Sequence, residues 1–478
     1  MGEERHRAAT ERLLDQLSAL PPGAPVRLGK RTSNLFRQRT SSDTARLDVS
    51  DFTHLVEIDP VGRTARVQGM TTYEELVAAT LPHGLMPLVV PQLRTITLGG
   101  AVTGLGIEAS SFRAGLPHES VLELEILTGA GEVVVARPDG EHAELFRTFP
   151  NSYGSLGYAL ALTIELEPVH PYVALHHVRF HHLDDVVTAI GRIMGTREWE
   201  DEPVDFLDGV VFSADEAYLT LGRWSDTVDG APGQDAPSDY TGQQVFYRSL
   251  QQRERDVLTV HDYLWRWDTD WFWCSRAFGA QQPLVRRLWP KRKLRSDVYW
   301  KIVAFENRHH VMARLDARRG RPPRERVVQD VEIPLAHTAE FVGWFLRTVP
   351  VEPVWLCPVQ LRKDGVLPGA TGHTGPSPDD ARETPWPLYP MERDQPYVNV
   401  GFWSTVPIEP GHRDGDVNRA IEHEVGRLGG HKSLYSDSYY NEPTFDRLYG
   451  GNHYREVKKR YDPLGRLPTL YDKAVRRR

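Results

Sequence analysis

Residues 94–132, RTITLGGAVTGLGIEASSFRAGLPHESVLELEILTGAGE, contain the pattern that decides the fold. Glycines that lie this close together let backbone N–H groups approach a large anionic ligand without obstruction by a Cβ atom. The run that follows, Val121–Ile126, alternates in the way of a strand, which would anchor the loop in a sheet. The stretch therefore predicts a sheet-anchored loop that cradles an extended anionic cofactor.

The length and composition are those of a globular protein with more than one domain. The chain has 478 residues, of which 40% are hydrophobic and 26% charged, and its formal net charge is −8. Only Cys274 and Cys357 carry thiols, which argues against a disulfide framework and a cysteine-built metal site. We expect a reducing, cytoplasmic location and no metal. A negative net charge with one local basic patch argues against nucleic-acid binding.

The N-terminal part shows a mixed pattern of helices and strands. The first twenty residues predict an amphipathic helix and lack the apolar core of a signal peptide. Short strands are predicted at 25–30, 54–58 and 64–67, and a capping box at Thr71–Glu74 predicts a helix through about residue 81. Composition then changes near Pro168 and again near 400. We therefore predict three parts, 1–170, 171–400 and 401–478, the last returning toward the cofactor.

Two plans for binding a cofactor compete in the glycine loop. Gly104-x-Gly106-x-x-Ala109 imitates a dinucleotide fingerprint, but that fingerprint must open a helix, and Ser110-Ser111 interrupts one. The favoured alternative is that separate loops converge on one cofactor. These loops are Lys30–Asn34, Pro91–Gly106, Gly115–Val121 and Gly154–Gly157.

The order of these loops resembles the FAD-binding domain of vanillyl-alcohol-oxidase-type (PCMH-type) flavoproteins. The resemblance implies an α+β fold, in which a two-subdomain FAD-binding domain is followed by a mixed sheet-and-helix cap domain. The first loop is not rich in glycine, and Glu119 stands where Asp is usual. Because that loop holds no His or Cys, the resemblance implies non-covalent FAD. The residues it implies for FAD binding are Lys30, Arg31, Thr32, Ser33, Asn34, Pro91, Gln92, Thr97, Leu98, Gly99, Gly100, Thr103, Gly104, Gly106, Ile107, Ser110, Gly115, His118, Glu119, Ser120, Gly154, Ser155, Gly157 and Ile164.

Within that family the chain looks most like the 24-dehydrocholesterol reductase (Diminuto) branch. The likeness rests on Thr97–Ser111, Trp355–Pro358 and Leu434–Asn441. That branch uses FAD and NADPH to saturate an isolated carbon–carbon double bond in a lipid. The chain is also similar to bacterial enzymes that reduce 10-methylene-stearoyl phospholipid to the 10-methyl (tuberculostearoyl) form. The methyltransferase that makes the methylene lipid, and a second copy of the chain, are then possible partners. A sterol side-chain reductase, an alcohol or sugar oxidase and a lipid-binding protein remain alternatives.

Reduction of an isolated alkene requires a proton donor near the hydride donor. Our choice is Tyr439, oriented by Asp437 or Asn441, with Glu108 as a second candidate beside the glycine loop. The competing interpretation is that these are core aromatics and ordinary caps. Other candidates are Tyr435, Tyr440, His431, His309 and His310, of which the two neighbouring histidines could instead hold an NADPH phosphate.

A tryptophan-rich and basic segment at 263–295 suggests a face that docks on an anionic membrane. Arg276–Arg295 holds seven Lys or Arg and no acid. The alternative is a solvated basic helix beside a tryptophan-rich core. If the face exists, replacing Arg286, Arg287, Lys291 and Arg292 with Ser is expected to weaken liposome binding.

Overall fold

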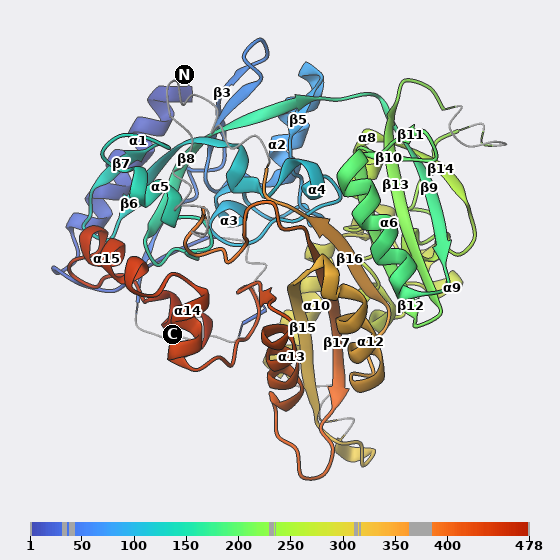
Figure 1. Cartoon of the computed structure of the whole chain (residues 1–478). Helices are drawn as coiled ribbons and strands as arrows, with labels where there is room; N and C mark the ends of the chain where they lie inside the picture. The colour runs from blue at the N-terminus through green and yellow to red at the C-terminus, as the bar shows by residue number, and fades with distance from the viewer. Residues whose placement is uncertain are drawn as a thin grey trace.

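Two β-sheets joined near residue 170 form the framework (Figure 1). The computed structural model describes residues 2–30, 36–37, 44–228, 234, 236–309, 314, 317–362 and 385–476. Strand β8 (Gly157–Pro168) is the last strand along the chain to join the first sheet, and β9 (Tyr172–Phe180) is the first to join the second. The predicted boundary at 170 falls between them.

The first sheet is antiparallel throughout. Its order is β3-β4-β8-β6-β7, and β5 pairs with β8 at one end. A dinucleotide fold of the G-x-G-x-x-G type needs parallel strands joined by crossover helices, so this arrangement excludes that alternative. A separate parallel pair, β1 with β2, lies beside the sheet. The strands are β1 (Val26–Leu28), β2 (Ala45–Leu47), β3 (Leu55–Asp59), β4 (Thr64–Gln68), β5 (Leu85–Pro87), β6 (Val121–Thr128) and β7 (Val133–Ala136).

Short helices hold the loops of the first sheet. A capping box begins α2 (Tyr73–Thr80), as the sequence predicts. It is formed by Thr72 and Glu75, one residue later than expected. The reason is that Thr71 is buried and its hydroxyl donates to the His54 carbonyl, 3.3 Å away. The other elements are α1 (Gly2–Ser18), α3 (Leu98–Val102), α4 (Ser111–Ala114), α5 (Ala143–Thr148) and the 3-10 turns at Leu81–His83 and Pro117–Ser120.

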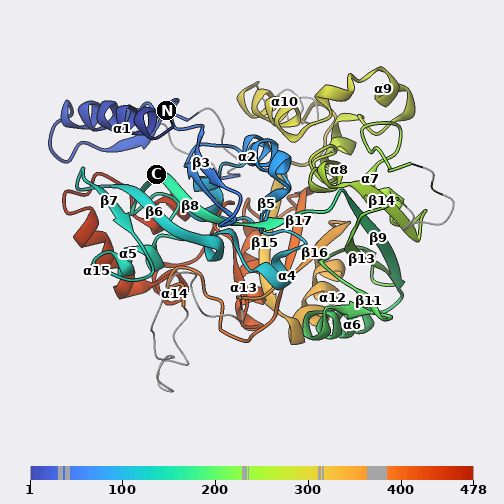
Figure 2. The same cartoon turned by 90° about the horizontal axis from the view of Figure 1, so that it is seen from above.

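The second sheet has eight strands in the order β14-β9-β13-β12-β16-β17-β15-β18. Alternate residues of its strands pack on opposite faces. Leu356 joins the core under α6, α12 and α13, whereas Trp355 and Cys357 face the tryptophan-rich segment and the first sheet. Figure 2 shows α6 and α12 on one side of this sheet and α7 to α10 on the other.

The strands of this part of the chain are β10 (Glu198–Trp199), β11 (Glu202–Pro203), β12 (Phe206–Ser213), β13 (Glu216–Ser225), β14 (Arg255–Thr259), β15 (Arg324–Pro334), β16 (Val354–Val359), β17 (Tyr397–Pro407) and β18 (His431–Lys432), of which β10 and β11 form a separate pair. The helices are α6 (Leu183–Thr196), α7 (Phe246–Ser249), α8 (Val260–Leu264), α9 (Pro283–Leu288), α10 (Ser296–His309), α12 (Thr338–Thr348) and α13 (Asp416–Arg427), with 3-10 turns at Cys274–Phe278, Lys291–Lys293 and Leu335–His337.

The predicted boundary at residue 400 is wrong, because it falls inside β17 and β18 still belongs to the second sheet. The chain returns to the first sheet only afterwards, through α14 (Glu442–Leu448), α15 (Gly451–Tyr461) and α16 (Leu470–Ala474). The Ala130 N–H donates to the Tyr461 carbonyl (2.9 Å) and the Val26 N–H to the Arg466 carbonyl (3.2 Å). Figure 1 shows α14 and α15 beside the first sheet.

Four of the five tryptophans in the 263–295 segment do not lie on the surface. Trp265, Trp267, Trp271 and Trp273 are buried, and so is Arg286, whose Nη1 lies 2.7 Å from Asp270 Oδ1. The expectation that these tryptophans and Arg286 contact a membrane is therefore wrong, because they build the core between the two sheets. Among the residues described, no helix is both long enough and apolar enough to cross a bilayer.

Candidate active site

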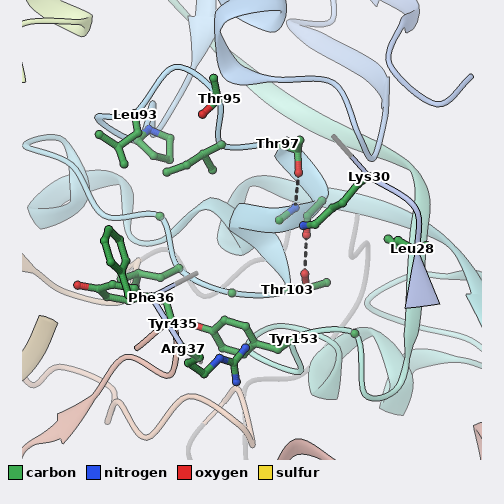
Figure 3. Close-up of a pocket in the computed structure, with 18 of the residues that line it drawn as sticks. Leu28, Lys30, Phe36, Arg37, Leu93, Thr95, Thr97, Thr103, Tyr153 and Tyr435 are labelled. Atoms are coloured by element: carbon green, nitrogen blue, oxygen red, sulfur yellow. Dashed lines mark hydrogen bonds between the residues drawn. The ribbon is translucent and has the colours of Figure 1, made fainter. Parts of the chain in front are cut away.

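A large cavity lies where the glycine loops of the first sheet face the second sheet (Figure 3). The first sheet and its loops contribute segments 26–30, 91–107 and 153–159 to its wall. The second sheet and the tryptophan-rich segment contribute Trp271, Phe272, Asp330, Trp355, Asn399 and Trp403, and the tail adds Tyr435 and Lys473. The cavity therefore draws on all three parts of the chain.

Hydrogen bonds bring the two main glycine loops together at one end of the cavity. The Gly100 N–H donates to Thr97 Oγ1 (3.1 Å), and Thr103 Oγ1 donates to the Gly99 carbonyl (2.6 Å), as the dashed lines in Figure 3 show. The Tyr153 N–H donates to the Thr103 carbonyl at 2.7 Å. The segments Thr97–Gly106 and Gly154–Gly157, which any extended cofactor would need side by side, therefore share one wall.

The glycine at 106 is required by close packing of these loops. A Cβ atom there would lie 2.7 Å from Pro117 Cγ and 2.8 Å from Pro91 Cγ. Among the described residues, no acceptor is recorded for the backbone N–H groups of Gly104, Leu105 and Gly106. Buried N–H groups are normally paired, so this loop suits a ligand that brings its own acceptors.

Basic side chains surround the glycine end. Arg27, Lys30, Arg37 and Lys473 all line the cavity. Lys473 Nζ donates to the carbonyls of Tyr153 (3.0 Å) and Gly154 (2.9 Å), and so ties the tail to the glycine loop. Asp330 is the only carboxylate among the described lining residues. This balance of charge favours an anionic ligand such as a diphosphate.

Another part of the cavity wall is aromatic. The rings of Phe272 and Trp403 stack with centroids 4.2 Å apart, and Trp355 lies 5.3 Å from Phe272. Phe36 stacks on Trp271 at 5.8 Å. Such a wall suits a flat ring system and an apolar substrate, and it excludes water from the space between them.

Three aromatic residues of the wall have a left-handed backbone. Tyr153, Trp271 and Phe272 have φ values of 49°, 47° and 58°. This conformation is unfavourable for bulky residues, so the surrounding structure must hold it in place. The Phe272 N–H, for example, donates to the Trp267 carbonyl at 2.8 Å. Strain of this kind gathers at functional sites, and here it sets the positions of the rings.

A buried acid lies beside the aromatic wall. Asp330 Oδ1 accepts from Asn399 Nδ2 (3.1 Å), and the Tyr435 hydroxyl also bonds this carboxyl while accepting from Trp403 Nε1 (3.1 Å). Burial raises the pKa of Asp330 to about 6, although the hydrogen bonds from Asn399 and Tyr435 oppose the rise. Burial also raises the pKa of Tyr435 well above its usual range. Asp330 is therefore the group of this cluster that exchanges a proton near neutral pH.

Comparison with known proteins agrees with this geometry. Residues 21–137 match the family described as an FAD binding domain. The chain is 26% identical over 458 residues to the Delta(24)-sterol reductase of Arabidopsis thaliana, an alignment that covers 90% of this chain and 77% of that protein. For the Delta(24)-sterol reductase of Mus musculus the identity is 25% over 440 residues, covering 88% and 76%. A decaprenylphosphoryl-beta-D-ribose oxidase of Mycolicibacterium smegmatis is 33% identical over 123 residues, 26% of each chain.

This chain is an FAD-binding oxidoreductase related to these reductases. The matched family region contains the glycine loop and the first wall segments of the cavity.

About half of the residues that the sequence predicts for FAD binding line the cavity of the oxidoreductase. Arg31–Asn34 lie outside the described residues, so their positions stay a prediction. Those in the wall are Lys30, Pro91, Gln92, Thr97, Gly99, Gly100, Thr103, Gly104, Gly106, Ile107, Gly154 and Gly157. Those behind the wall are Leu98, Ser110, Gly115, His118, Glu119, Ser120, Ser155 and Ile164.

The residues behind the wall hold the loops in place. Glu119 accepts from the N–H groups of Leu116 (2.9 Å) and Arg362 (3.0 Å), and burial raises its pKa to about 7. Ser110 Oγ donates to the Leu88 carbonyl at 2.8 Å. The His118 ring packs edge-on against Trp386, and burial lowers its pKa to about 3. These residues support the cavity rather than line it.

Tyr439, our choice of proton donor, and its two partners are not among the described residues that line the cavity. The Arg419 guanidinium lies 4.7 Å above the Tyr439 ring, Asp437 lies 3.4 Å from Arg326, and Asn441 caps α14. Tyr435, four residues earlier, is the tyrosine of this segment in the wall. The His309 side chain and His310 lie outside the described residues.

Glu108 also faces away from the cavity. Its Oε1 lies 2.7 Å from Arg266 Nη2, which lies 3.0 Å from Asp208 Oδ2. All three side chains are buried, and Asp208 also accepts from Trp267 Nε1 (2.9 Å) and Trp355 Nε1 (3.3 Å). The triad supports the tryptophan wall from behind.

Sequence reasoning missed Asp330 and Asn399. Both are buried polar residues in strands of the second sheet, within RVVQDVEIP and YVNVGFW. Burying a polar side chain inside a strand costs free energy unless the side chain forms a hydrogen bond or serves a function. Asn399 gives that signal, because it is the lone amide in an apolar run, whereas Asp330 stands between Gln329 and Glu332 and is not singled out by the sequence.

Proposed function

We propose that this oxidoreductase uses NADPH to reduce FAD and then saturates an isolated carbon–carbon double bond in a lipid. One observation carries the proposal: a single cavity joins a basic, glycine-lined end to an aromatic end that holds one buried acid of raised pKa. The first end fits a diphosphate and the second fits a flat ring beside an apolar substrate. The relatives named as Delta(24)-sterol reductases support a reaction of this class.

FAD would be held by the glycine end. The N–H groups of Gly104, Leu105 and Gly106, with the cations of Lys30 and Lys473, would bind its diphosphate. When bound and reduced by NADPH, the flavin would supply the hydride that adds to the double bond. The aromatic wall would exclude water from the reacting atoms.

Asp330 is proposed to supply the proton. A carboxyl group whose pKa is raised to about 6 is a far stronger acid than a tyrosine whose pKa lies well above its usual range. An isolated alkene is a weak base, so the stronger acid is the better donor. Tyr435 and Asn399 would hold the carboxyl group in position through their hydrogen bonds.

The proposed substrate is a methylene-bearing acyl chain, 10-methylene-stearoyl phospholipid, which would become the 10-methylstearoyl form. Protonation of an exomethylene CH₂ places developing charge on a tertiary carbon, where hydride can add. The second candidate is a sterol with a Δ24 side chain, which the names of the relatives favour.

Anaerobic stopped-flow absorbance separates these substrates. The FAD-loaded protein is reduced with NADPH and mixed with either methylene-acyl phospholipid or a Δ24-sterol. The methylene lipid is expected to restore the oxidised flavin band, and a response to the sterol alone would transfer the assignment to the second candidate. Reoxidation by neither lipid, with rapid peroxide formation in air and no use of NADPH, would replace the proposal with an oxidase.

A further inference from the structure

Helices α9 and α10 expose large apolar side chains at one edge of the molecule. Leu284 and Leu288 of α9 are 78% and 84% exposed, and Ile302 and Phe305 of α10 are 36% and 58% exposed. Leu284 and Leu288 are four residues apart, so they share one face of their helix. Figure 2 shows α9 and α10 along the same edge. Trp289, directly after α9, lies against Tyr299 of α10, with ring centroids 6.1 Å apart.

Positive charge accompanies these apolar side chains. Arg287, Arg292 and Lys293 are all exposed, and Arg276–Arg295 contains no acidic residue. Lys291 lies 3.1 Å from Asp239, so it adds less net charge to the edge. A local basic patch on a chain whose net charge is −8 provides a localised site for an anionic surface.

The same helix that exposes Ile302 and Phe305 also supports the cavity. Trp300 of α10 stacks on Phe36 with centroids 4.9 Å apart and lies 5.7 Å from Trp271. Phe36 and Trp271 are both wall residues. One side of α10 thus packs behind the aromatic end of the cavity, while the other meets solvent.

We propose that α9 and α10 form a docking surface for an anionic phospholipid bilayer. We define this surface by Leu284, Leu288, Ile302, Phe305, Arg287, Arg292 and Lys293. Leucine and phenylalanine side chains enter the boundary between headgroups and acyl chains, while the cations bind anionic headgroups. Docking would place the aromatic end of the cavity next to the source of a lipid-borne alkene. Apolar residues of α9 and α10, rather than the buried tryptophans, make the contact.

Vesicle co-sedimentation of the full-length FAD-loaded protein tests the proposal. Binding to phosphatidylglycerol vesicles at low salt is expected, with much weaker binding to phosphatidylcholine vesicles. The variant L284S/L288S is expected to lower the partition coefficient roughly tenfold. The matched control is V61S, since Val61 is 94% exposed in the β3–β4 turn, far along the chain from the surface. Its binding is expected to equal that of the unchanged protein.

A charge variant tests whether the exposed cations of this surface contribute to vesicle binding. R287Q/R292Q/K293Q is expected to lower binding at least roughly tenfold at low salt. Its control, R5Q/R7Q/K459Q, removes the same net charge from exposed positions on α1 and α15. Equal loss in both triple variants would show that only net charge matters and would overturn the proposal.

Two further results would also overturn it. One is unchanged vesicle binding in L284S/L288S. The other is a dimer of the unchanged protein that L284S/L288S converts to a monomer in size-exclusion chromatography, which would make the surface a contact between two copies. These measurements need no turnover, so they stand apart from the reaction proposed above. A detergent-dispersed methylene lipid should still reoxidise the flavin of L284S/L288S.

Discussion

Asp330 combines three properties at the scale of one residue: it lines the cavity, it is buried, and its carboxyl accepts hydrogen bonds from Asn399 and Tyr435. Its raised pKa reflects the cost of placing a charge in this environment. The proton is therefore retained to higher pH than on an exposed aspartate.

The variant D330N is expected to lose the alkene half-reaction. The rate at which lipid reoxidises NADPH-reduced flavin should fall by at least about 100-fold, since a positioned acid contributes roughly 10²–10⁴-fold. Reduction of the flavin by NADPH should continue, because that half-reaction needs no proton from Asp330. Both rates are read by anaerobic stopped-flow absorbance, and equal loss of both would contradict the assignment.

The stability of D330N provides a check on folding. The folded-state pKa of Asp330 lies above its unfolded value, so its contribution to stability is lost as pH rises through about 6. Asparagine cannot ionise, so at pH 8 the variant should be more stable by up to about 3 kcal/mol. Urea unfolding at pH 5 and pH 8 measures this difference, and a variant that is less stable at both values would show that packing dominates.

The pH profile of alkene reduction should follow the protonated carboxyl group. The rate is expected to fall as pH rises through about 6. The Tyr435 hydrogen bond lowers the pKa of Asp330, so Y435F should move the falling limb to higher pH. The control is Y439F, whose ring lies away from the cavity and whose profile should match that of the unchanged protein. A shift in both variants, or in neither, would remove Tyr435 from the proposed positioning role.

At the scale of elements, the triad of Glu108, Arg266 and Asp208 joins the glycine loop to β12 through the tryptophan-rich segment. Burial of two carboxylates is tolerated because one guanidinium lies between them. Trp267 and Trp355 add donors to Asp208, which aligns the aromatic wall.

Removing that guanidinium should therefore destabilise the fold strongly. R266M leaves two uncompensated buried acids and is expected to cost about 3–5 kcal/mol in the free energy of unfolding. R287M, at an exposed arginine, should change it by no more than about 0.5 kcal/mol. Denaturant unfolding of both variants provides the comparison. A small loss in R266M would mean that the acids protonate without penalty.

At the scale of the whole molecule, the tail closes the cavity that the two sheets leave between them. Lys473 lies on α16, over 300 residues after the glycine loop that it contacts. Its ammonium group both fixes that loop through two carbonyls and adds positive charge to the cofactor end of the wall.

The variant K473M should consequently bind FAD more weakly. Loss of charge-assisted hydrogen bonds worth about 1.5–3 kcal/mol predicts a Kd for FAD at least roughly tenfold higher. K459M changes an exposed lysine of the same tail and is expected to leave the Kd unchanged. Fluorescence titration of deflavinated protein measures both values. Equal FAD affinities in K473M and K459M would show that Lys473 does not contribute to FAD binding.

Local sequence patterns predicted the local elements well. The alternation at 121–126 appears as β6, and the residues around 54–67 form the β3–β4 hairpin. Even the capping box was misplaced by only one residue, because both Thr71 and Thr72 can cap and only burial selects between them. The glycines of the loop were expected to let an anionic ligand approach the backbone, and the structure adds a second reason at Gly106, where a Cβ atom would meet Pro91 and Pro117.

The chemistry of the site depended on contacts between distant segments. Asp330 and Asn399 meet because β15 pairs with β17, and Tyr435 reaches them because the chain passes through β18 first. Sequence spacing placed Tyr439, Asp437 and Asn441 close together but could not show which side of the segment faces the cavity. The backbone conformation of a short segment depends mainly on its own residues and their immediate neighbours, so the sequence by itself determined the strands, the helices and the glycine loop. The position of each polar side chain relative to the cavity and the burial of the tryptophans were decided only by tertiary structure, because the desolvation that raises a pKa or hides a ring comes from residues distant in the sequence.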